Sequence, residues 1–170
     1  MSTEKPEPLT FDKSTWGDGP WQSEPDRIEF EHAGLPCLML RARNGGWCGY
    51  AAVPPSHPWH RKDYSSCLSD PPCGDDAFCY EDTPAGRVTV HGGLTYADAC
   101  QGHICHVPKP GEPDNVWWFG FDCAHSGDVS PAYDSMWRGT SLESREDSYR
   151  DVLYVRAEVE RLAEQLARVK

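Results

Sequence analysis

The chain has 170 residues, of which 38% are hydrophobic and 11% aromatic, and its net charge is -11. This length and aromatic content predict a single folded domain over 1–170. The acidic excess repels nucleic-acid backbones and anionic lipid surfaces, so we expect no direct binding to nucleic acid or to membranes. The first residues contain no apolar leader segment and no later stretch is long enough to span a bilayer, which predicts a cytoplasmic protein.

The first half of the chain predicts a coil followed by three strands. Residues 1–26 are rich in proline, glycine and acidic residues and are expected to form an N-terminal coil on the core. Alternation of apolar and polar residues predicts a strand over 27–32, with a second strand over 35–41. A turn signal at 44–46 leads into a third strand over 47–53.

The segment 61–86 is predicted to be a surface insertion. It is rich in Asp, Pro and Gly, and it carries Cys67, Cys73 and Cys79 at equal spacing. Equal spacing is compatible with metal binding, but no histidine lies in this interval. Three unpaired thiols in a loop explain the pattern equally well.

Alternation resumes over 87–91 and predicts a strand that ends at His91. Residues 98–104 are expected to form a short helix or turn. The apolar run at 116–121 is typical of a central strand covered on both faces, and it leads directly to Asp122.

The C-terminal segment, 145–169, predicts a long helix because apolar residues recur there at steps of three and four. This apolar stripe suits either a homodimer seam or packing on the sheet of the same chain. We favour the second, since a small sheet needs a cover. The predicted fold class is therefore α+β, a small and mainly antiparallel sheet covered by a long C-terminal helix.

The candidate site consists of His91, Asp122, His125 and Asp128. If the strands ending at His91 and Asp122 are neighbours, their ends bring imidazoles and carboxylates together. Such a set suits a divalent metal, zinc or manganese, which could polarise water for hydrolysis. We expect His91, Asp122 and His125 as metal ligands and Asp128 as ligand or base.

A small-molecule ligand is expected beside these residues. The residues predicted to line its site are Gly92, Gly93, Thr95, Tyr96 and Trp118. The glycine pair is explained at least as well by a tight turn, and an aromatic residue in a strand more often belongs to the core.

The eight cysteines are expected to remain thiols or to bind metal in a reducing compartment. Cys100, Cys105 and His106 form an alternative, structural zinc set. Buried thiols beside a hydrogen-bonded histidine are the simpler interpretation of this cluster.

Three motifs resemble those of a family of small uncharacterised proteins of bacteria and their phages. They are WGDGPW at 16–21, HGGLTY at 91–96 and WWFGFD at 117–122. The resemblance extends over nearly the whole chain and implies no particular activity.

The leading hypothesis is metal-assisted hydrolysis of a small, nucleotide-like substrate. One alternative is a non-catalytic binder of the phage accessory or counter-defence type, which sequesters a small signalling molecule or a host protein. Another alternative is a zinc-stabilised interaction module.

Overall fold

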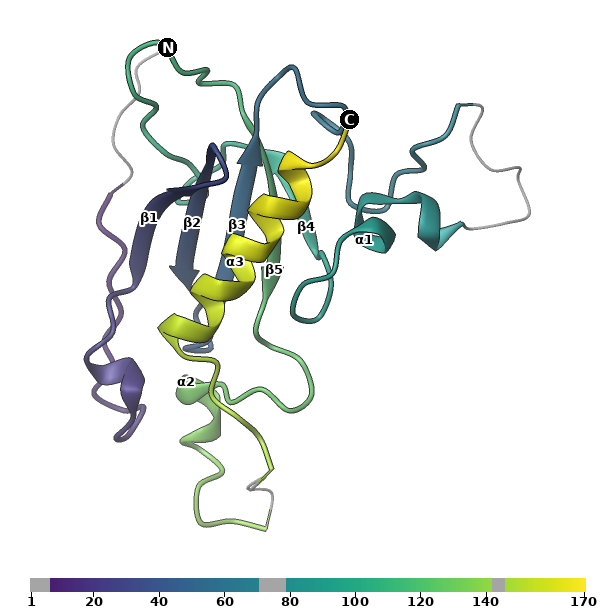
Figure 1. The fold of residues 1–170 in the computed structure, drawn as a ribbon. Helices are drawn as coiled ribbons and strands as arrows, with labels where there is room; N and C mark the ends of the chain where they lie inside the picture. Colours follow the sequence, from purple (N-terminus) through teal and green to yellow (C-terminus); the bar gives the residue numbers. More distant parts are fainter. Residues whose placement is uncertain (1–6, 71–78, 142–145) are drawn as a thin grey trace.

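The computed structural model of the chain describes residues 7–70, 79–141 and 146–170. Within these ranges, five strands form one antiparallel sheet in the order β1-β2-β3-β5-β4 (Figure 1). The strands are β1 (Arg27–His32), β2 (Leu35–Arg41), β3 (Trp47–Val53), β4 (Tyr96–Ala99) and β5 (Trp117–Asp122). Together with the C-terminal helix α3 (Val152–Ala167), this sheet confirms the predicted α+β class.

Local turn chemistry sets the register of the first three strands. Ala33 and Gly34, which join β1 to β2, both have positive φ, as a tight hairpin turn requires. Between β2 and β3, the Asn44 side chain accepts a hydrogen bond from the Gly46 N–H, and Gly45 also has positive φ. The three predicted strands therefore pair as consecutive hairpins.

Helix α3 crosses one face of the sheet (Figure 1). Asp151 caps its N-terminus by accepting a hydrogen bond of 2.8 Å from the Tyr154 N–H. The predicted apolar stripe is buried against this face; its fully buried members are Val155, Val159, Leu162 and Leu166. This confirms that the stripe packs on the chain's own sheet. A homodimer through the C-terminal helix stays a prediction.

The opposite face of the sheet, which we call the outer face, carries a second apolar cluster. Its buried members are Leu38, Leu40, Tyr50, Ala52, Val116 and Trp118, and Leu9 and Ile104 pack on them. Because Phe119 and Phe121 lie in the core beneath α3, β5 is covered on both faces, as its apolar run predicts.

The predicted strand over 87–91 is wrong. A short helix, α1 (Pro84–Arg87), ends there, and the following residues run extended outside the sheet. Val88 and Val90 are buried, which explains the alternating pattern. The backbone of Thr89, however, bonds to the Gln165 side chain of α3 through both its N–H and its carbonyl, each at 2.9 Å, instead of to a neighbouring strand.

The fourth strand lies later in the chain, at β4, where a helix or turn was expected. Tyr96 and Asp98 stand opposite Gly120 and Trp118 of β5 in antiparallel register. Pairing with the long apolar strand β5 thus decides the conformation of a segment whose own sequence is ambiguous.

The described part of 61–86 contributes to the core as well as to the surface. Ala85 is buried, and Tyr64 and Leu68 pack against the cluster beneath α3. The 3-10 helix η2 (Tyr80–Asp82) leads into α1. Cys73 lies outside the described residues.

Two further short elements complete the fold. They are the 3-10 helix η1 (Pro20–Gln22) and the helix α2 (Pro131–Asp134). No helix in the described ranges is both long and apolar enough to cross a membrane.

Candidate functional site

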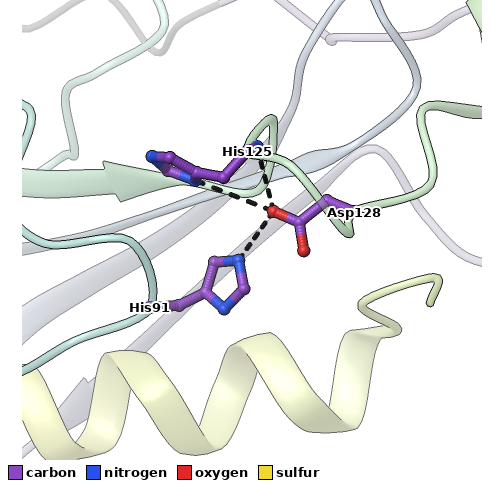
Figure 2. Close-up of side chains that lie close together, drawn as sticks. All are labelled: His91, His125 and Asp128. Atoms are coloured by element: carbon purple, nitrogen blue, oxygen red, sulfur yellow. Dashed lines mark hydrogen bonds and ion pairs between the residues drawn. The ribbon is translucent and has the colours of Figure 1, made fainter. Parts of the chain in front are cut away.

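His91 lies in the turn that follows the extended segment, directly beside α3 (Figure 2). Its backbone N–H donates to Glu158 Oε2 at 2.7 Å, which fixes the turn against the helix. Its ring Nε2 lies 2.7 Å from Asp128 Oδ2, and Nδ1 lies 2.9 Å from the Tyr154 hydroxyl. Both ring nitrogens therefore have fixed partners, and the orientation of the imidazole is set from two sides.

Asp128 is the centre of the cluster, and its side chain is only 1% exposed. Oδ2 faces His91 and also accepts the His125 N–H at 3.1 Å, while Oδ1 accepts from Arg150 Nε at 2.8 Å. Burial opposes ionisation of this carboxyl, but the hydrogen bonds from Arg150 and His91 outweigh it, so the pKa of Asp128 lies below its ordinary value. Asp128 is thus held as a carboxylate at neutral pH.

His125 completes the group from the loop after β5. Its Nδ1 lies 3.7 Å from Asp128 Oδ2 and 3.7 Å from Asp122 Oδ1. This nitrogen is buried and has no hydrogen-bond partner in the described part of the chain. Gly92 packs against the ring, since a Cβ at that position would lie 2.1 Å from His125 Cε1. The glycine therefore permits the close approach of the two loops.

His91, His125 and Asp128 form a group that could hold a metal ion, because their donor atoms all lie within 4.8 Å of one another. Two ligands bound to one ion at ~2.1 Å can be no more than ~4.2 Å apart. The separations of 2.7 and 3.7 Å from Asp128 Oδ2 to the two imidazoles lie within that limit. Small side-chain adjustments would bring all three donors to one ion.

Asp122 does not join this group. Its Oδ2 accepts a hydrogen bond of 2.9 Å from the Thr95 hydroxyl, and its Oδ1 accepts from the Ala124 N–H. Asp122 stands opposite Cys48 in the sheet, and directly paired residues point to the same face, which here is the outer face. His91, by contrast, lies on the α3 side, so the structure brings it to Asp128 instead.

The residues expected to line a ligand site are divided between two places. Gly92 and Thr95 adjoin His125 and Asp122, respectively, and Gly93 lies in the same turn with open space around it. Trp118 is fully buried in the outer-face cluster, and Tyr96 packs edge-on against Tyr50 on that same face. Trp118 and Tyr96 therefore belong to the outer-face packing and lie apart from the cluster at Asp128.

The sequence reasoning missed three residues of the site, namely Arg150, Tyr154 and Glu158. They recur every four residues, so they line one side of α3 and the turn before it, next to the buried stripe. Arg150 also lies over the Tyr154 ring, 5.0 Å from its centroid. The spacing of these three polar residues, four apart as on one side of a helix, is the sequence signal that could have identified them.

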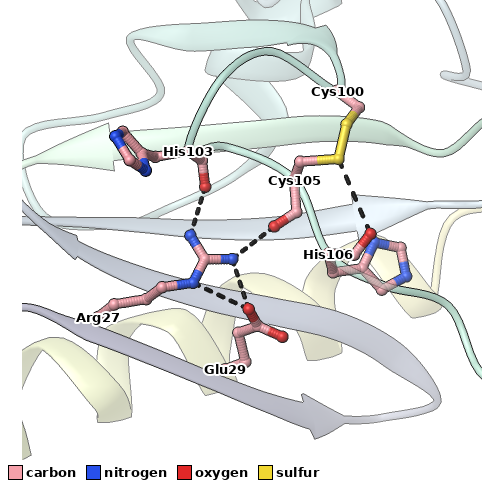
Figure 3. The surroundings of a disulfide bond; sticks show 6 residues. All are labelled: Arg27, Glu29, Cys100, His103, Cys105 and His106. Carbon is pink, nitrogen blue, oxygen red and sulfur yellow. Dashed lines mark hydrogen bonds and ion pairs between the residues drawn. A yellow bond between two sulfur atoms is a disulfide. The ribbon is translucent and has the colours of Figure 1, made fainter. Parts of the chain in front are cut away.

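Cys100 and Cys105 are joined in a disulfide (Figure 3). The expectation that these two cysteines remain thiols is therefore wrong. Reciprocal backbone hydrogen bonds between Gln101 and Ile104 form a tight turn that brings the two Cα atoms within 4.7 Å. Both sulfurs are used in the disulfide, so they are not available to the alternative zinc set with His106.

The cluster around Asp128 has two chemical capabilities. It can present two imidazoles and a carboxylate to a cation, or it can relay a proton between Tyr154 and Asp128 through His91. Comparisons with protein-family models, with curated proteins and with solved structures return no significant match for this chain.

Proposed function

We propose that His91, His125 and Asp128 bind one divalent metal ion, zinc or manganese, and that the protein uses it to hydrolyse a small substrate. One observation carries this proposal: three donor atoms from two loops, His91 on one and His125 and Asp128 on the other, converge within 4.8 Å, and His125 Nδ1 is buried with no partner in the described residues. A buried nitrogen without a hydrogen bond is costly unless something else occupies its lone pair.

The contacts around the three donors support metal binding. Ligating histidines usually donate their second ring N–H to a neighbour, and ligating carboxylates are usually hydrogen-bonded through their other oxygen. Tyr154 stands at the second nitrogen of His91, and Arg150 occupies Oδ1 of Asp128, which leaves Oδ2 for the ion. In the present geometry His91 Nε2 shares a hydrogen bond with Oδ2, so binding would require the His91 proton to reside on Nδ1 instead.

The number of donors supports hydrolysis as the reaction. Catalytic zinc sites use three protein ligands and leave a position for water, which the metal activates as a nucleophile. The exposure of the site also fits, since the His125 side chain is 35% exposed and that of Arg150 29%. Arg150 and the ion would together attract phosphoryl oxygens, and we therefore propose a small phosphorylated substrate of the nucleotide class.

Activity assays on metal-loaded protein test this function. The panel contains nucleoside phosphates, bis-p-nitrophenyl phosphate and p-nitrophenyl acetate, each with zinc or manganese. We expect hydrolysis of a phosphate substrate that is lost in His125→Ala and retained in His32→Ala, a partly exposed histidine on β1. Equal activity in wild type and His125→Ala, or no activity across the panel with either metal, would contradict the proposed reaction.

A second function is favoured by one observation. Asp128 already accepts hydrogen bonds from Arg150, from His91 and from the His125 N–H, so the cluster is stable as it stands. It could therefore serve as one wall of a non-catalytic small-molecule site. Native mass spectrometry of chelator-treated protein distinguishes the two, because a bound small molecule that survives chelation supports the binder and its absence supports the metal site.

A further inference from the structure

The Cys100–Cys105 disulfide lies at the end of β4, on the wall of a cavity of about 310 Å³. Cys100 lines this cavity and is exposed, whereas Cys105 does not line it and is half-buried. The two sulfurs of the bond therefore differ in their access from solvent. A reagent that enters the cavity meets Cys100 first.

His60 and Arg61 line the same cavity, and they belong to a basic segment, His60 to Lys62. Two hydrogen bonds tie it to the start of β5: His60 Nε2 lies 2.8 Å from the Asn115 carbonyl, and Trp117 Nε1 donates to the Lys62 carbonyl at 2.9 Å. Between them, Arg61 adopts a left-handed backbone with φ 64°, which is unfavourable for a residue with a Cβ and is maintained by these two anchors. The segment is thus held in place beside Cys100.

Arg61 makes this cavity attractive to anions in an otherwise acidic protein. The chain as a whole carries a net charge of -11, which repels small anions. No carboxylate of the described residues forms an ion pair with the Arg61 guanidinium, although Asp114 also lines the cavity. An incoming anion would therefore find a guanidinium that is not already held in an ion pair.

The loop that carries both sulfurs is held independently of the disulfide (Figure 3). Arg27 donates to the carbonyls of His103 and Cys105, and Gln101 and Ile104 exchange two backbone hydrogen bonds. Cleavage of the S–S bond would leave these contacts intact. The two sulfurs would therefore stay near each other, so that the disulfide can form again.

From this geometry we infer that Cys100–Cys105 is a reducible disulfide and that the cavity beside Arg61 receives the small anionic thiol that attacks it. The thiolate sulfur of the incoming thiol bonds to Cys100 Sγ, the Cys100–Cys105 bond breaks, and the electron pair leaves with Cys105 as a thiolate, which then takes up a proton. A second thiol attacks the mixed disulfide, forms the oxidised thiol dimer and releases Cys100 as a thiol. This site is separate from the cluster at Asp128 and does not depend on the function proposed for it.

Three free cysteines elsewhere in the chain form thiolates less readily than an ordinary cysteine. Burial raises the pKa of Cys48 to about 11 and that of Cys37 to about 12, and it also raises the pKa of Cys123. These three thiols are therefore poor nucleophiles toward oxidised glutathione and should not compete with Cys100 when that reagent is used to trap the mixed disulfide.

The test compares two monothiols, glutathione, which is anionic, and β-mercaptoethanol, which is uncharged. Reduction of the folded protein is followed by intact mass after alkylation. Arg61→Asn removes the cation and keeps a residue that tolerates left-handed φ, and the control Arg43→Asn removes an exposed cation elsewhere. We expect Arg61→Asn to slow reduction by glutathione about threefold at low salt, the effect of one charge at ~7 Å in water. Reduction by β-mercaptoethanol should not change.

The attacked sulfur is identified with two further variants. Cys105→Ser leaves Cys100 as a free thiol, whose thiolate attacks oxidised glutathione, releases one glutathione and keeps the other in the same mixed disulfide that forms during reduction. Peptide mapping should find this adduct on Cys100, and Cys100→Ser should give little adduct at Cys105. The inference is overturned if the purified protein lacks the disulfide, if Cys105 is the residue modified, or if Arg61→Asn slows both thiols equally.

Discussion

Two clusters in this molecule each pair a buried carboxylate with an arginine, and they differ in how completely their polar atoms are used. In the first, which we call the Arg41 cluster, the guanidinium is fully buried and donates to Glu24 at 3.0 Å, to Asp26 at 2.6 Å and to two backbone carbonyls. Its plane lies over the Trp47 ring, 4.3 Å from the centroid. This cluster joins the N-terminal coil to the sheet, and Glu24 also accepts from the Val152 N–H at the start of α3.

The second cluster, at Asp128, is equally buried at its centre but open at its rim. His125 Nδ1 has no partner in the described part of the chain, and the rings of His91 and Tyr154 reach the surface. The comparison indicates that a charge pair whose polar atoms are all hydrogen-bonded stabilises the fold. A cluster with an unused nitrogen lone pair and an exposed edge is instead suited to bind a metal ion or a ligand. The predictions below separate these two roles.

The largest effect is expected from Arg41→Ala. Removal of Arg41 leaves Glu24 buried without its cation, although Asp26 keeps Lys13 at 2.7 Å, and the loss of one partner of a buried ion pair typically costs about 3–5 kcal/mol. Urea unfolding should show this loss, while the matched control Arg43→Ala, an exposed arginine two residues away, should stay within about 0.5 kcal/mol of wild type. A loss under 1 kcal/mol in Arg41→Ala would remove the distinction between the clusters.

Gly92→Ala should damage the metal site through sterics alone. The added Cβ would meet the His125 ring at 2.1 Å, so His125 must move away from Asp128. Gly93→Ala is the matched control, because both glycines have positive φ but a Cβ on Gly93 meets nothing within 4 Å. Both variants should lose about 1 kcal/mol of stability from the left-handed backbone. Only Gly92→Ala should also lose about 100-fold in zinc affinity, and equal affinities in the two variants would contradict the proposed position of His125.

Tyr154→Phe removes only the hydroxyl that faces His91 Nδ1 at 2.9 Å. Loss of a hydrogen bond behind a metal ligand typically weakens binding 10–100-fold, and we expect the lower end because Tyr154 is 37% exposed. Isothermal titration with zinc measures this, with Tyr133→Phe, an exposed tyrosine on α2, as control. Unchanged affinity in Tyr154→Phe would show that the hydroxyl does not orient His91.

The smallest expected effect is on the pH dependence of the unfolding free energy. Burial alone would raise the pKa of both carboxyls. Hydrogen bonds from Tyr149 and Arg41 nevertheless lower the pKa of Glu24 below its ordinary value of 4.5, and hydrogen bonds from Lys13 and Arg41 lower that of Asp26 below its ordinary value of 3.8. A carboxyl whose folded pKa is depressed adds stability above its ordinary pKa and loses that contribution as the pH falls through the folded value. Unfolding free energy should therefore decline between roughly pH 5 and pH 2. The decline should be shallower in Glu24→Gln, and an identical slope in that variant would contradict the assignment.

Features that depend on local pattern could be predicted from the sequence. The helical stripe around Val159 and the hairpin turn at Gly45 follow from spacing and turn chemistry, which act within a few residues. The strand expected before His91 was wrong because a distant side chain, Gln165, satisfies the backbone of Thr89.

The sequence predicts which residues make up the site but not which of them lie next to one another. His91, His125 and Asp128 could be named because imidazole and carboxylate groups are concentrated there. Their arrangement depends on which face of β5 carries Asp122 and on where α3 passes, and no local pattern fixes either. Arg150 and Tyr154 were missed for the same reason, since they approach His91 only through tertiary packing.

The central claim is that one divalent ion binds between His91, His125 and Asp128. Isothermal titration of chelator-treated protein with zinc, repeated with manganese, tests it most directly, with His125→Ala and His32→Ala measured alongside. We predict one ion per chain for wild type and His32→Ala, and a loss of at least about 100-fold in affinity for His125→Ala, equivalent to about 2.7 kcal/mol. Wild-type protein that binds neither metal, or His125→Ala that binds as tightly as wild type, would contradict the account.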